Sequence, residues 1–203
     1  MRILGFLLII IVFTIQVAFG KEVRTRYGFY IDLPDDYISL SANMDDLLKQ
    51  NENNELNIDK KFFNDMMAGS TKSDLNIEYY FPRKKYKAEF NNIYIQVQEG
   101  INFKELLAYT EQEICNLMTE QLSALYQKKV KLYSCNYDPS FIDKKTSPGV
   151  YYMQTDGPFK NQRAHFVFLQ TNQGFTSFVA GCEFINCSKF KNDMIKITNS
   201  RSE

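Results

Sequence analysis

The stretch RAHFVFLQTNQGFTSFVAGC, residues 163–182, decides the fold. It contains two runs of aromatic and β-branched residues, 163–171 and 175–182, which are typical of strands. Only Asn172, Gln173 and Gly174 separate the two runs, and so short a connection predicts a hairpin. Hairpin-linked strands pair antiparallel, whereas a parallel pair needs a long crossover. We therefore expect an antiparallel sheet.

Strand-like runs continue on both sides of this hairpin. They cover residues 26–33, 75–81, 92–98, 130–137 and 150–155. Apolar residues recur at helical spacing in residues 41–73 and 103–127, and again after Ser188, which is expected to cap a terminal helix. Thr110 and Glu113 form a capping-box pattern, which predicts a break in the long helical stretch near Tyr109.

This order of elements predicts a single globular α+β domain over residues 21–203. Short links between most strands favour hairpins over crossovers, so the sheet is expected to be antiparallel, with about six to seven strands covered by helices. A chain of 203 residues is long enough to bury the core that such a domain needs.

The first twenty residues predict a signal peptide. Arg2 supplies a positive start, and an apolar run of about 17 residues follows, near the lower limit for spanning a bilayer. Ala18 and Gly20 are small residues that place cleavage before Lys21. A retained membrane anchor is the alternative. The signal-peptide interpretation predicts a secreted or periplasmic protein with no membrane span after cleavage.

Export makes disulfides the expected state of the four cysteines. Two local pairs, Cys115–Cys135 and Cys182–Cys187, are favoured among the three possible pairings. Chain-entropy arithmetic assigns roughly 3 kcal/mol of stabilisation to the first and about 2 to the second. The cysteines lack paired C-x-x-C spacing, so neither a metal site nor a redox motif is predicted.

Composition excludes several functions. The 24 basic and 24 acidic side chains balance, whereas a general nucleic-acid binder needs a surplus of cations. The single histidine, His165, cannot form a multi-histidine site and lies in a strand-like run, where an ordinary surface or half-buried role is favoured. No nucleophile-elbow, zinc-protease or P-loop motif is present. We therefore predict no catalytic residue, no metal and no cofactor.

The opening of the predicted domain, RYGFYIDLPDDY at residues 26–37, resembles the G-F-x-I-x-L-P-x-x-W/Y pattern of the PsbP-like family. Gly28, Phe29, Leu33 and Pro34 carry the resemblance, and the order of the later elements agrees with it. Tyr37 stands where the family usually has tryptophan, and the Asn-rich insertion after it is long. The resemblance implies an α/β/α sandwich and an accessory or binding protein rather than an enzyme.

A binding surface is the main functional expectation, and it has two parts. Tyr151, Tyr152 and Phe159 are the aromatic candidates, because such side chains suit recognition surfaces, although sheet packing is the favoured explanation of the tyrosines. The charged candidates, within an aromatic-rich segment, are Arg83, Lys84 and Lys85.

These features predict an exported, non-catalytic accessory module that binds a protein partner or a small ligand. Two alternatives stay open. One is a secreted hydrolase with a dispersed Asp, Ser and His165 site, since such triads assemble in space rather than in sequence. The other is a structural component of an envelope assembly.

Overall fold

The computed structural model describes residues 20–39, 57, 59, 77–83, 85–98, 101–140 and 147–202. The strands in these ranges are β1 Lys21–Arg24, β2 Tyr30–Leu33, β3 Tyr37–Ser39, β4 Ile77–Pro82, β5 Asn92–Gln98, β6 Leu132–Asp138, β7 Val150–Asp156, β8 Gln162–Thr171 and β9 Gly174–Glu183. The helices are α3 Phe103–Leu106, α4 Glu111–Leu125 and α5 Cys187–Ser200.

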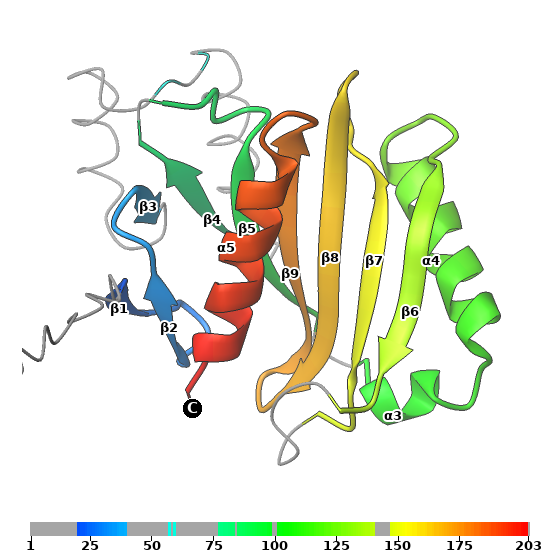
Figure 1. Cartoon of the computed structure of the whole chain (residues 1–203). Coiled ribbons are helices and arrows are strands. Elements are labelled where there is room, and N and C mark those ends of the chain that lie inside the picture. The colour runs from blue at the N-terminus through cyan, green and yellow to red at the C-terminus, as the bar shows by residue number, and fades with distance from the viewer. Residues whose placement is uncertain are drawn as a thin grey trace, which may run out of the picture.

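The main sheet has seven strands in the order β3-β4-β5-β9-β8-β7-β6, and every neighbouring pair is antiparallel (Figure 1). The predicted hairpin lies near its centre, where β8 and β9 pair from Gln162↔Glu183 to Thr171↔Gly174. The predicted fold class and strand number are therefore confirmed.

Helices cover both faces of the main sheet, as strand alternation requires. The side covered by α5 and the β1–β2 hairpin, called here the α5 face, carries the larger core, which includes Ile93, Phe178 and Phe190. The opposite side, the α4 face, packs Tyr151 and Phe166 against α3 and α4. Figure 1 shows α5 lying across the middle strands, while α4 lies beside β6.

Two expectations about local structure were wrong. Residues 26–33 do not form one strand, because Gly28 adopts a φ of +92° and its amide donates to the Thr25 carbonyl in a turn between β1 and β2. The terminal helix begins at Cys187 after Asn186, so Ser188 is not its cap. Residues 1–19, Lys84 and almost all of the helical region predicted at 41–73 lie outside the described residues.

Both predicted disulfides are present. Cys115 on α4 bonds to Cys135 on β6, and Cys182 on β9 bonds to Cys187 at the start of α5. Each bridge ties a helix to the sheet it covers. Within the described part of the chain, no helix is both long and apolar enough to cross a membrane.

The predicted break near Tyr109 divides the long helical stretch into α3 and α4, and a capping box opens α4. The Glu113 amide donates to Thr110 Oγ1, and the Thr110 amide donates to Glu113 Oε2 at 2.7 Å.

We expect Thr110→Ala to lower the free energy of unfolding by about 1 kcal/mol, because the first turn of α4 loses its side-chain acceptor. Urea denaturation followed by circular dichroism measures the change. Thr110→Ser keeps the hydroxyl and should remain close to wild type. Equal losses in both variants would show that the methyl group, not the cap, matters.

Candidate functional site

The α4 face holds a cavity of about 580 Å³. Alternate residues of the central strands form its floor, among them Tyr94 and Gln96 on β5 and Ser177 and Val179 on β9. Successive strand residues point to opposite faces, so the intervening residues of these strands pack under α5 instead. The sheet thus presents a continuous floor that the core does not fill.

The C-terminal half of α4 forms one wall of this cavity. The sequence pattern places Ile114, Met118, Leu122 and Leu125 on one apolar stripe, yet they differ in burial. Ile114 is 1% exposed, whereas Leu125 is 72% exposed. Met118, Leu122 and Leu125 line the cavity. The stripe therefore packs into the core at its start and borders an open space at its end.

Amide, hydroxyl and carboxyl side chains interrupt a lining that is mainly apolar. Glu89 lines the cavity, and its Oε2 is buried without a hydrogen-bond partner. Burial, reinforced by Tyr79, raises the pKa of Tyr126 to about 12, so this phenol stays protonated at neutral pH. Apolar walls with a few placed polar groups are typical of small-molecule sites of this size. The unsatisfied carboxylate oxygen is an available acceptor for a ligand.

The three aromatic candidates do not form one surface. Tyr151 and Tyr152 are neighbours on β7 and point to opposite faces, where Tyr151 is core and Tyr152 borders a different cleft. Phe159 does line the cavity, 40% exposed, with its ring edge against Phe90. One groove containing all three is therefore ruled out by strand alternation.

The charged candidates lie apart from the cavity. Arg83 and Lys85 are exposed next to the end of β4, and the Lys85 ammonium lies 5.5 Å from the centre of the Tyr86 ring. Lys84 is outside the described residues. Neither described cation is among the residues that line the cavity.

His165 borders a second, smaller cleft of about 270 Å³ on the α5 face. The side chain is buried, which corrects the expectation of a surface or half-buried residue, and its Nε2 has no hydrogen-bond partner. Burial, together with the nearby positive charges of Lys191 and Arg163, lowers the pKa of His165 to about 4. Ser134 also lines this cleft, but no carboxylate does among the described residues.

No protein-family model matches the chain, and no curated protein matches its sequence. Its structure is similar to the solution structure of cyanobacterial PsbP (CyanoP) from Synechocystis sp. PCC 6803. The two share 8% sequence identity with a TM-score of 0.56, over 93% of this chain and 95% of that chain. The chain has a PsbP-like fold.

The resemblance seen in residues 26–37 is thus confirmed at the level of the fold. Within the PsbP-like fold, the two clefts lie on opposite faces of the sheet. Both linings include Met153 and Phe166, but only the cavity is lined by Ala164 and Phe168 of β8, and only the smaller cleft by the intervening His165. Sequence reasoning missed most of the cavity. The available signal was β5, where polar or aromatic Asn92, Tyr94 and Gln96 alternate with aliphatic residues in a central strand.

Proposed function

We propose that this chain is an exported, non-catalytic accessory protein whose α4-face cavity binds a small, largely apolar ligand with one hydrogen-bond donor. The buried, unpartnered Oε2 of Glu89 in a lining that is mainly apolar is the observation that carries the proposal. Transfer of an apolar ligand from water into the cavity is favourable in free energy, and a donor on the ligand would form a hydrogen bond with the Glu89 carboxylate.

Export rests on separate grounds. Residues 1–20 have the charge, apolar run and small residues of a signal peptide. All four cysteines are paired, as in proteins of oxidising compartments. A secreted or periplasmic location accounts for both features, and sequencing the N-terminus of the mature protein should find Lys21 first.

Non-catalytic binding is preferred to hydrolysis because of the surroundings of His165. A hydrolase of the Ser-His-Asp type needs a nucleophile and an orienting carboxylate in contact with the imidazole. The described lining of the His165 cleft supplies Ser134 but no such carboxylate. A role through a protein partner in an envelope assembly would instead use the exposed Phe184 and Ile185, which are 50% and 90% exposed.

Fluorescence titration with N-phenyl-1-naphthylamine, a neutral apolar amine, tests the cavity. We expect saturable binding to the folded protein with a rise in emission. Ser177→Trp should weaken this binding by roughly tenfold or more, because its ring would occupy the cavity. Glu89→Leu should also weaken it, since the amine then loses its acceptor.

Ser134→Trp is the matched control, because it adds the same ring on the opposite face of the sheet, in the His165 cleft. Met118→Trp places an indole ring in the cavity from α4, and it replaces Ser177→Trp in the test if that variant fails to fold. Circular dichroism verifies each fold. Dye binding that is absent, or that survives both cavity-filling variants, would refute the proposed site.

A further inference from the structure

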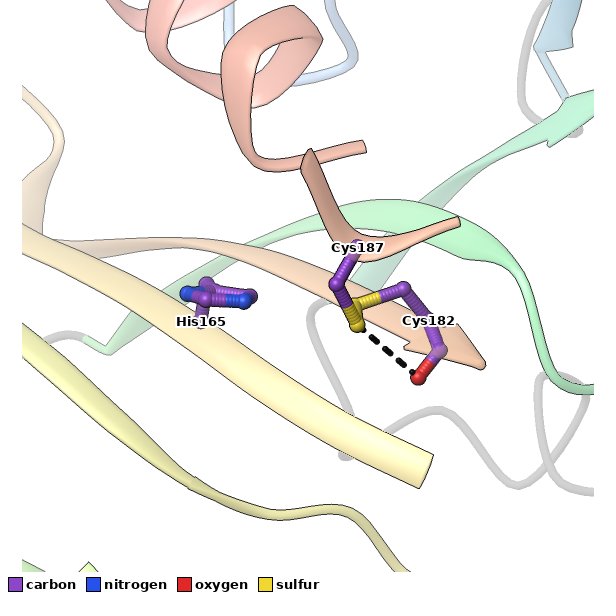
Figure 2. A group of neighbouring side chains, drawn as sticks. All are labelled: His165, Cys182 and Cys187. Carbon is purple, nitrogen blue, oxygen red and sulfur yellow. Dashed lines mark hydrogen bonds between the residues drawn. A yellow bond between two sulfur atoms is a disulfide. The ribbon is translucent and has the colours of Figure 1, made fainter. Parts of the chain in front are cut away.

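Three potential metal ligands meet beneath the start of α5. The ligand atoms of His165, Cys182 and Cys187 all lie within 4.8 Å of one another (Figure 2). Among the described residues, no other group of three histidine, cysteine or acidic side chains is arranged closely enough to hold a metal ion. The cluster combines two sulfur atoms with one imidazole, which is a ligand set for soft metal ions.

The fold brings these residues together from three elements. His165 on β8 pairs with Ala180 on β9, and Cys182 lies two residues further along β9, on the same face. Cys187 is the first residue of α5, which packs over β8 and β9. Rigid strands and a helix end therefore fix all three positions, as a metal site requires.

An unsatisfied imidazole nitrogen gives a second, independent indication of a ligand. His165 is 7% exposed, and its buried Nε2 has no hydrogen-bond partner. Buried polar side-chain atoms are nearly always paired, so an orphaned nitrogen on a ring this close to two sulfurs calls for an explanation. A metal ion bound to Nε2 would supply the missing partner.

The Cys182–Cys187 bridge decides whether the cluster can bind metal. Disulfide sulfurs carry no thiolate charge, and the thiolate is the form that binds metal ions. After reduction, Cys187 would sit at the N-terminus of a 14-residue helix, whose dipole favours a thiolate. Lys191 and Arg163 act electrostatically on His165 and would favour thiolates at the same place.

We propose that reduction of the Cys182–Cys187 disulfide opens a Cys2His site for a soft metal ion such as Zn²⁺. A dithiol reductant gives two electrons and two protons to the bridge and becomes a disulfide itself, leaving two thiols on the protein. Zn²⁺ then binds both sulfurs and His165 Nε2, and the two thiol protons pass to water. Three protein ligands would leave the fourth position of a tetrahedral Zn²⁺ to a water molecule.

Co²⁺, a spectroscopic substitute for Zn²⁺, tests this site. The folded protein is reduced with a phosphine, freed of reductant without air, and titrated with Co²⁺. We expect the reduced protein to bind one equivalent of Co²⁺ and to show a thiolate-to-cobalt charge-transfer band. Zn²⁺ should displace the Co²⁺ and remove this band. The oxidised protein should not show the band. His165→Gln should weaken Co²⁺ binding by roughly tenfold or more.

The second disulfide provides the matched control. The Cys115→Ser/Cys135→Ser double variant should keep the absorption band, and Cys182→Ser/Cys187→Ser should lose it. The opposite pattern, or no band in the reduced folded protein, would overturn the proposal. If reduction unfolds the chain, Cys182→His opens the bridge without reductant and keeps a metal-binding side chain. Failure of that folded variant to bind Co²⁺ would also overturn it.

Discussion

Phe178→Ala is expected to lower the free energy of unfolding by about 3–5 kcal/mol. Phe178 is fully buried on β9, the middle strand of the seven, and its ring lies 6.2 Å from that of Phe29. Its neighbours across the ladder are Ile95 on β5 and Val167 on β8, also fully buried. The surrounding strands are paired on both sides and cannot collapse into the space that alanine leaves.

Urea denaturation of the oxidised protein measures this loss against two controls. Phe178→Leu leaves a smaller cavity and should cost markedly less. Phe184→Ala removes the same side chain at a position that is 50% exposed, so we expect a change within about 1 kcal/mol. A loss at residue 178 no larger than at residue 184 would mean that β9 does not anchor the core.

Local patterns were sufficient to predict most of the sheet. The run at residues 92–98 matches β5, and the Asn172-Gln173 connection forms the central hairpin. The Thr110 and Glu113 pair predicted where α4 starts. These features depend on residues close in the sequence, so a single chain contains the information needed to predict them.

Features that depend on tertiary position could not be predicted in this way. The sequence of α4 has the same apolar stripe whether the helix covers a packed core or borders a cavity. Which of the two occurs depends on the side chains of the sheet that faces the helix. The sequence pattern alone therefore could not indicate that Met118 and Leu125 line a cavity. Tyr151 and Tyr152 are both aromatic candidates for one recognition surface, yet strand alternation places them on opposite faces of the sheet.

The environment of His165 is a further feature that the local sequence could not predict. Its neighbours in sequence, Ala164 and Phe166, are those of an ordinary strand residue. Its special environment comes from Cys182 on the next strand and Cys187 on α5. The even number of cysteines predicted the bridge, but nothing near residue 165 indicated that the bridge lies against the imidazole.

Lowering the pH from about 6.5 to 4 should destabilise the oxidised, metal-free protein by about 3 kcal/mol through His165. In the unfolded chain this imidazole has a pKa near 6.5, whereas burial and the charges of Lys191 and Arg163 lower the folded-state pKa to about 4. Between these values the unfolded chain binds one more proton, so stability decreases as the pH falls. At pH values well above 6.5 or well below 4, His165 does not make the free energy of unfolding depend on pH.

The measurement compares wild type with His165→Gln, whose amide does not titrate. Urea unfolding in EDTA at several pH values gives two curves, and their difference removes the carboxylates that both proteins share. We expect the variant to lose about 3 kcal/mol less than wild type between pH 6.5 and 4. Parallel curves would mean that the folded protein accepts a proton at residue 165 as easily as the unfolded chain does. That result would be incompatible with an imidazole buried against the bridge, because a desolvated ring whose Nε2 has no partner cannot take up charge without cost.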